Sequence, residues 1–368
     1  MTQKINILIP DGSSTWAMSV ISCLSRIKSY KLFVLSSKKQ TPAKYSRYTS
    51  YFKYYEKKSD ASWLHIINAE IEENEISVVV PIAENEIHFF IKYAHQISDS
   101  TKIIPLPDLG AFAIAINKRK LNKILKDSDI PHPNSVFIED INEIKKVDSI
   151  KFPVLLKPLH EKGGDGILRF DSSSDLKPYL SENKALFLQE YIKGYDIDCS
   201  VLYDNGALIC HTIQKGNLSG HNTYAPHLGF DFYNDDQVLS VVKQVMSKLN
   251  WSGVAHVDLR YDALSKTFKI LEINARFWGS VETSKIVGIN FPDLAIKLAL
   301  GKPIEPQNFE SISALRFKGF LKLVKRRPST LFRFKFIRNN TEVPYVLKDP
   351  MPIIFRWFEW FGRKMSPD

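Results

Sequence analysis

The sequence predicts an α/β protein with a parallel sheet in its first domain and antiparallel sheets in a larger, two-lobed domain that follows. Two patterns support this. Short aliphatic runs alternate with helical patterns up to about residue 110, whereas from about residue 136 such runs are joined mainly by turns. The chain has 368 residues, of which 44% are hydrophobic, so it can bury more than one core. We therefore expect a domain at 1–110, a two-lobed domain at 111–304 and an extension at 305–368.

The first domain is predicted from four aliphatic runs separated by helical segments. Strands that alternate with helices form parallel sheets with helices on both faces. The runs lie at residues 5–10, 31–37, 77–81 and 102–107.

The second domain is predicted to begin with an amphipathic, lysine-rich helix over 111–130. Strands follow it. Asp204, Asn205 and Gly206 lie between two apolar runs and indicate a hairpin, hence an antiparallel sheet. We place a small lobe at about 136–190 and a large lobe at about 191–304.

The cysteines and the N-terminal segment exclude several classes of protein. Cys23, Cys199 and Cys210 are far apart and form no CxxC pair, so neither a disulfide framework nor a zinc site is indicated. The apolar run at the N-terminus is too short for a signal peptide, and no segment has transmembrane length. We therefore expect a cytoplasmic protein.

Much of the net charge of +10 comes from the C-terminal extension. Residues 316–364 contain thirteen Lys or Arg residues against three acids, with Phe and Trp among them. Bases beside aromatic residues are typical of peripheral contact with an anionic membrane. A packed subdomain with a solvated basic face is the alternative. No nucleic-acid-binding module is recognised, so no specific nucleic-acid partner is expected.

A glycine-rich turn follows a predicted strand that ends at Lys157. Gly163, Gly164 and Gly166 can bring backbone N–H groups close to phosphate oxygens. The segment is not a P-loop, because no Gly-Lys-Ser/Thr follows. An ordinary turn remains the alternative interpretation.

The stretch HVDLRYDALSKTFKILEINARF carries the strongest chemical signal. Asp258 lies in one predicted strand, and Glu272 and Asn274 share a face of the next. These oxygen donors suit Mg²⁺ that is bound together with nucleotide phosphates. Arg276 follows and could clamp a phosphoryl group. The alternative is a solvent-facing strand edge, but the apolar residues on the opposite face place this strand in a core.

Five segments, which follow one another in the expected order, resemble the ATP-grasp superfamily. Within that superfamily they resemble the carbamoyl-phosphate-synthetase and biotin-carboxylase-like branch of carboxylate–amine ligases. They are Lys118 in NKRK, Lys157, QEYIKGYDID, HVD and LEINAR, and the resemblance covers about residues 1–300. It implies a pre-ATP-grasp domain at 1–110 and an ATP-grasp domain at 111–304. The sequence departs from several relatives in having Asp258 where they have Gln or Glu, and it lacks features specific to biotin carboxylase.

The resemblance also implies roles for individual residues. Lys118 and Lys157 would contact the ATP phosphates, and the glycine turn would close over them. Asp196 would hold the ribose, with Asp198 as the alternate, and Arg276 would stabilise the transferred phosphate. The adenine hinge would be formed by Gln189, Glu190, Tyr191 and Ile192, and Mg²⁺, with Mn²⁺ as a substitute, would be bound by Asp258, Glu272 and Asn274.

The expected function is therefore ATP-dependent joining of a small carboxylate to a small amine through an acyl phosphate. Lys215 and His221 lie in a loop that would border the acceptor site, with a polar surface loop as the alternative. Two other functions compete with the ligase: a nucleotide-binding regulatory or scaffold protein without turnover, and a membrane-surface adaptor that acts through the basic tail. The sequence specifies neither the two substrates nor the oligomeric state.

Overall fold

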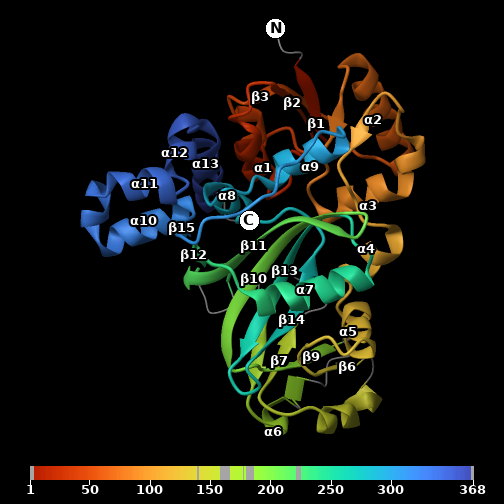
Figure 1. Cartoon of the computed structure of the whole chain (residues 1–368), viewed down its shortest axis with the longest axis vertical. Helices are drawn as coiled ribbons and strands as arrows, with labels where there is room; N and C mark the ends of the chain where they lie inside the picture. Colours follow the sequence, from red (N-terminus) through yellow and green to blue (C-terminus); the bar gives the residue numbers. More distant parts are fainter. Residues whose placement is uncertain are drawn as a thin grey trace.

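A computed structural model describes residues 4–138, 141–157, 166–176, 178–179, 186–220 and 225–365. These residues form three sheets, one parallel and two antiparallel, which confirms the predicted fold class. Figure 1 shows the first domain at the top, the small lobe at the bottom and the C-terminal helices at the side. No helix in the described ranges is both long and apolar enough to cross a membrane.

The first domain is built on a parallel five-stranded sheet of order β3-β2-β1-β4-β5. All four predicted strands are present, and β3, which the sequence did not indicate, extends one edge. Its apolar strands are covered by helices, as the alternating pattern requires. The elements are β1 (Ile5–Ile9), α1 (Ala17–Leu24), β2 (Tyr30–Ser36), η1 (Pro42–Tyr45), β3 (Thr49–Tyr54), α2 (Asp60–Glu73), β4 (Val78–Val79), α3 (Glu84–Tyr93), η2 (Ala94–Gln96) and β5 (Lys102–Ile103).

The predicted single helix over 111–130 is wrong, because the structure has two helices there. They are α4 (Leu109–Ala115) and α5 (Lys118–Asp127). The Asn117 side chain accepts hydrogen bonds from the backbone N–H groups of Arg119 and Lys120, at 3.0 Å each. Asparagine is a favourable N-cap, so it starts a new helix where the apolar periodicity alone would continue the old one.

The small lobe is a four-stranded antiparallel sheet of order β6-β9-β7-β8. Strand β9 pairs with both β6 and β7 and leads directly into the segment that joins the two lobes. The elements are β6 (Ser135–Ile138), η3 (Ile141–Ser149), β7 (Val154–Lys157), β8 (Leu168–Phe170), α6 (Ser173–Leu176) and β9 (Leu186–Glu190).

The large lobe contains a six-stranded antiparallel sheet of order β14-β13-β10-β11-β12-β15. The predicted hairpin joins β10 to β11, with φ of 46° at Asn205 and 81° at Gly206, values that suit asparagine and glycine in a tight hairpin turn. The elements are β10 (Gly194–Asp204), β11 (Ala207–Leu218), β12 (Gly229–Phe232), α7 (Asp236–Lys248), β13 (Gly253–Asp262), β14 (Thr267–Asn274), α8 (Val281–Ile286) and α9 (Phe291–Ala299).

The C-terminal extension packs against both the large lobe and the first domain. Strand β15 completes the six-stranded sheet by pairing with β12. The Asp349 carboxylate accepts hydrogen bonds from Ser46 Oγ at 2.5 Å and Arg47 N at 3.1 Å, and Phe355 stacks on Tyr45. The elements are β15 (Ser313–Leu315), α10 (Phe317–Arg326), η5 (Pro328–Phe332), α11 (Phe334–Asn340), α12 (Val343–Lys348) and α13 (Met351–Met365).

Candidate functional site

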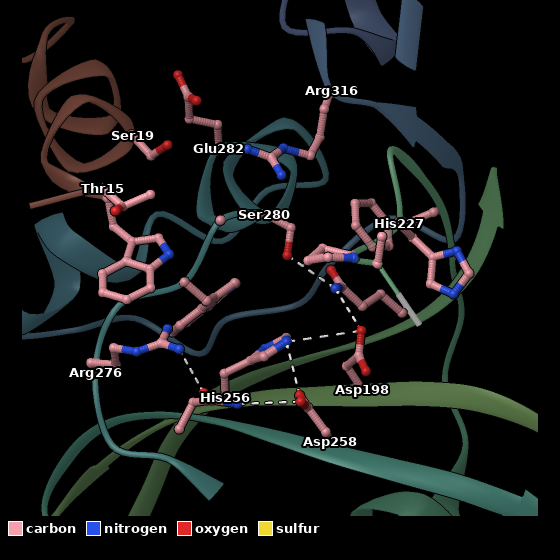
Figure 2. A pocket seen from close by; sticks show the side chains of 18 of the residues that line it. Thr15, Ser19, Asp198, His227, His256, Asp258, Arg276, Ser280, Glu282 and Arg316 are labelled. Carbon is pink, nitrogen blue, oxygen red and sulfur yellow. Dashed lines mark hydrogen bonds and ion pairs between the residues drawn. The ribbon is translucent and has the colours of Figure 1, made fainter. Parts of the chain in front are cut away.

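A large cavity of about 1780 Å³ lies where the first domain, the two lobes and the C-terminal helices meet. Most of the residues to which the sequence assigned a role lie on its wall. Figure 2 shows Asp198, His256 and Asp258 on the strands at one side, and Ser19, Glu282 and Arg316 at the other. The predicted residues that line the cavity are Lys118, Lys157, Gln189, Glu190, Tyr191, Ile192, Asp196, Asp258, Glu272, Asn274 and Arg276.

Asp258, Glu272 and Asn274 converge on the cavity from two paired strands. Asp258 pairs with Glu272 in the register of β13 and β14, so both side chains lie on one face. The Asn274 amide nitrogen lies 3.3 Å from Asp258 Oδ2 and 3.5 Å from Glu272 Oε1. Burial, the charge of Glu272 and that of Asp198 raise the pKa of Asp258 well above its usual value. A cation between these oxygens would relieve their repulsion.

The two predicted phosphate-binding lysines lie near this acidic group. Lys157, at the end of β7, donates a hydrogen bond of 2.7 Å to Gln189 Oε1. Burial lowers the pKa of Lys157, and the nearby charge of Lys118 lowers it further, whereas Glu272 raises it. Burial favours the neutral form of Glu272, but its hydrogen bond with Asp258 and the charges of Lys157 and Lys118 bring its pKa below the ordinary value. The basic and acidic groups thus stabilise each other's charged forms.

Arg276 links the acidic group to the first domain. Its Nη2 donates to Asn274 Oδ1 at 2.6 Å, and its Nε lies 3.4 Å from Glu84 Oε1. The guanidinium carbon lies 3.7 Å from the centroid of the Trp16 ring, a cation–π contact. The side chain is therefore fixed at the domain junction with its charge beside the acidic oxygens.

The predicted adenine hinge connects the two lobes, and the predicted ribose ligand lies next to it. The Glu190 backbone N–H donates to Asn134 O at 2.8 Å, and the Tyr191 N–H donates to Pro153 O at 2.9 Å. Asp196 forms an ion pair with Arg260 at 2.5 Å. A ribose hydroxyl would therefore have to share the Asp196 carboxylate with Arg260. The hinge segment thus lies along the cavity wall.

Sequence reasoning missed a group that adjoins Asp258. His256 lies two residues before it on β13, and one atom from each of His256, Asp258 and Asp198 lies within 4.8 Å of the others. Ser200 Oγ lies 2.8 Å from His256 Nδ1, and burial lowers the pKa of His256 to about 3, so its ring is neutral. Strand alternation could have identified His256, because residues two apart share a face. Asp198, the alternate ribose ligand, lies on the cavity wall beside this group, and its role toward a ribose stays a prediction.

Several expectations fall elsewhere. Gly163, Gly164 and His221 lie outside the described residues. Gly166 is described and has a φ of 73°, a conformation that favours glycine. Lys215 is not among the residues that line the cavity. Its Nζ lies 3.6 Å from the centroid of the Tyr195 ring.

The donor set fits a magnesium ion. Asp258, Glu272 and Asn274 offer hard oxygen donors from adjacent positions of two paired strands, which is the type of ligand that Mg²⁺ prefers. These three residues would hold the ion. It would supply positive charge against a triphosphate.

Comparison with known proteins finds similarity to an ATP-grasp family. Residues 182–319 match a family described as ATP-grasp in the biosynthetic pathway with Ter operon. The large chain of carbamoyl phosphate synthase from Thermoanaerobacter sp. is 21% identical over 212 residues, which are 54% of this chain and 20% of that protein. The chain therefore spans about a fifth of the length of that curated relative.

Two solved structures share the fold. The L-amino acid ligase from Bacillus licheniformis superposes with a TM-score of 0.61 at 17% identity, covering 83% of this chain and 76% of that one. The biotin carboxylase domain of Hydrogenobacter thermophilus 2-oxoglutarate carboxylase, in complex with MgADP and bicarbonate, gives a TM-score of 0.65 at 16% identity, covering 84% and 73%.

The fold is shared with these solved structures, and residues 182–319 match an ATP-grasp family. This confirms the resemblance predicted from the five sequence segments. Within the superfamily, the similarities lie with the carbamoyl-phosphate-synthetase and biotin-carboxylase-like branch.

Proposed function

We propose that this protein is a cytoplasmic ATP-grasp ligase that joins a carboxylate to an amine. The observation that carries the proposal is the convergence of Lys157, Asp258, Glu272, Asn274 and Arg276 on one cavity wall. A nucleotide-binding scaffold without turnover would not need this set of fixed cations and oxygen donors together, so the enzyme is favoured over the regulatory alternative.

The reaction follows from the charges. An oxygen of the substrate carboxylate attacks the γ-phosphorus of ATP, the bond to the bridging oxygen breaks, and ADP leaves. Lys118, Lys157 and Arg276 offset the repulsion between the two anions. The amine nitrogen then attacks the acyl carbon, phosphate leaves with the bonding electrons, and the nitrogen loses a proton.

The test is a phosphate-release screen with ATP, Mg²⁺ and pairs of amino acids or other carboxylated metabolites. Lys157→Ala should lose activity with every active pair, because it removes a cation from the phosphates. Lys151→Ala is the matched control, since Lys151 is exposed and six residues earlier. Unchanged turnover in Lys157→Ala would refute the role of this residue, and no phosphate release with any pair would count against the ligase.

One exposed segment within residues 316–364 favours a second candidate function, which is attachment to an anionic membrane surface. Leu331, Phe332 and Phe334 are 48%, 77% and 73% exposed. Residues 311–341 contain nine bases and no acid. Large apolar side chains beside bases match the headgroup region of an anionic bilayer.

The test of attachment is sedimentation with vesicles that contain an anionic lipid. Phe332→Ser/Phe334→Ser should reduce binding at all salt concentrations, and binding of the wild type should fall as salt rises. The control is Tyr179→Ser, which removes an exposed aromatic residue of the small lobe. Equal binding of the double variant, or binding to nucleic acid alone, would remove this candidate.

A further inference from the structure

The wall of the cavity opposite the acidic strands is built largely by the C-terminal extension. Glu282 from α8, Arg316 before α10, Glu342 before α12 and Arg356 from α13 all line it. Figure 2 shows Glu282 and Arg316 beside each other, across the cavity from Asp198, His256 and Asp258. A cavity of about 1780 Å³ is larger than the roughly 300–1,000 Å³ of a usual ligand pocket, so it has room for a substrate beside a nucleotide.

One of the two acids of this wall, Glu342, has an oxygen without a hydrogen-bond partner in the described part of the chain. Glu342 is only 6% exposed; its Oε2 accepts a hydrogen bond of 2.8 Å from Phe317 N, but its Oε1 has no hydrogen-bond partner in the described part of the chain. Arg316 Nε lies 3.9 Å from Oε1, too far for a hydrogen bond. Burial and the charge of Glu282 raise the pKa of Glu342 to about 8. An acceptor is thus left for a donor from a ligand.

The two arginines of the wall also lack close partners. Among the described residues, Arg356 makes no ion pair within 4.0 Å. Arg316 makes one, the contact of 3.9 Å with Glu342. Two other bases near this wall face an aromatic ring instead. Arg26 and Lys285 lie 4.4 and 5.4 Å from the centroid of Tyr345. The guanidinium groups of Arg316 and Arg356 therefore have N–H donors for an anion.

We propose that this wall is a binding subsite for a zwitterionic substrate, with its protonated amino group at Glu282 and Glu342 and its anionic group at Arg316 and Arg356. The subsite rests on the proposed function, since it would hold one of the two molecules that the ligase joins. When both acids are ionised, their charges balance those of the two arginines. A zwitterion then leaves this group of four neutral, whereas a singly charged ligand would leave one charge uncompensated. Tyr345 and Trp360, which line the same part of the cavity, offer contact for an apolar substituent.

The test uses three probes that differ only in charge: phenylalanine, phenethylamine without the carboxylate, and 3-phenylpropionate without the amine. Binding to the full chain is measured by calorimetry without ATP. Phenylalanine should bind at least tenfold more tightly than either analogue. Glu342→Gln should weaken phenylalanine at least tenfold and leave 3-phenylpropionate within twofold. Arg316→Gln should weaken phenylalanine and 3-phenylpropionate but spare phenethylamine.

The matched controls are Glu305→Gln and Arg338→Gln, which change exposed residues outside the cavity and should leave all three affinities unchanged. If circular dichroism shows that Glu342→Gln is unfolded, Glu282→Gln takes its place. No binding of phenylalanine, equal binding of a singly charged analogue, or indifference to both charge substitutions would overturn the subsite. Charge-dependent binding without phosphate release would keep the subsite and refute only the ligase.

Discussion

Two aspartates in this molecule, Asp11 and Asp258, both have a raised pKa but lie in different surroundings. Asp11, after β1, and Asp258, on β13, are both half-buried, and burial is the first cause that raises the pKa of each, to about 8 for Asp11. Asp11, however, accepts hydrogen bonds from the backbone N–H groups of Ile82 at 3.2 Å and Ala83 at 2.7 Å. Asp258 faces the cavity beside a second acid. A raised pKa therefore marks a candidate site only where the carboxylate also faces open space.

The largest expected difference between the two sites is in activity. Glu272→Ala removes a carboxylate from the acidic pair at Asp258 and should lower ATP-dependent phosphate release by about 10²–10³-fold, the range found when one transition-state contact is lost. Asp11→Asn should stay within twofold, because Asp11 does not line the cavity. Steady-state phosphate release measures both. A comparable loss in Asp11→Asn would erase the distinction.

The next effect is on stability. Asp11→Ala leaves the N–H groups of Ile82 and Ala83, at the start of α3, without their acceptor. We expect the free energy of unfolding to fall by about 1–3 kcal/mol. Asp11→Asn keeps one oxygen acceptor and should lose less. Denaturant titration of both variants checks this, and equal loss in the two would show that the hydrogen bonds are not the cause.

The pH dependence should also separate the sites. The pKa of Asp11 is about 8 in the folded chain and 3.8 in the unfolded chain, so the unfolded state releases the proton first as pH rises. Stability due to this group is present below about pH 4 and is lost as pH rises towards 8, by up to about 1.4 kcal/mol per pH unit. The wild type should therefore lose stability relative to Asp11→Asn between pH 5 and 8. A constant difference would contradict the shift.

The smallest expected effect is on the stability of the protein when Asp258, in the cavity wall, is substituted. Asp258→Asn removes a repulsive charge from the pair with Glu272 and, without metal, should raise stability at pH 8 by on the order of 1 kcal/mol. It should also reduce the stabilisation that Mg-ADP gives. Thermal melts with and without Mg-ADP measure both quantities. Destabilisation of the metal-free variant would mean that the carboxylate is needed for packing.

The parts of the site that follow local patterns could be predicted from the sequence. Glu272 and Asn274 share a strand face, and the register of β13 and β14 brings Asp258 opposite Glu272. Glu342 could not be predicted in this way. It reaches the cavity through the packing of α12 against distant elements, which no local periodicity records. Asn117 shows a different limit, because one capping side chain divided a helix that the apolar pattern joined.

The cavity is closed by residues that lie far apart in the sequence. Ser19 lies in α1 and Arg26 two residues after it, whereas Glu342 lies just before α12 and Arg356 lies in α13. On the ribosome the N-terminal domain emerges and folds first. It therefore exists for some time without the cavity wall that the C-terminal extension forms. A nascent chain can thus form the strands that carry Asp258 and Glu272 before it can form the wall that we propose to bind a second reactant. The proposed substrate subsite is completed only after residues 316–356 have been synthesised.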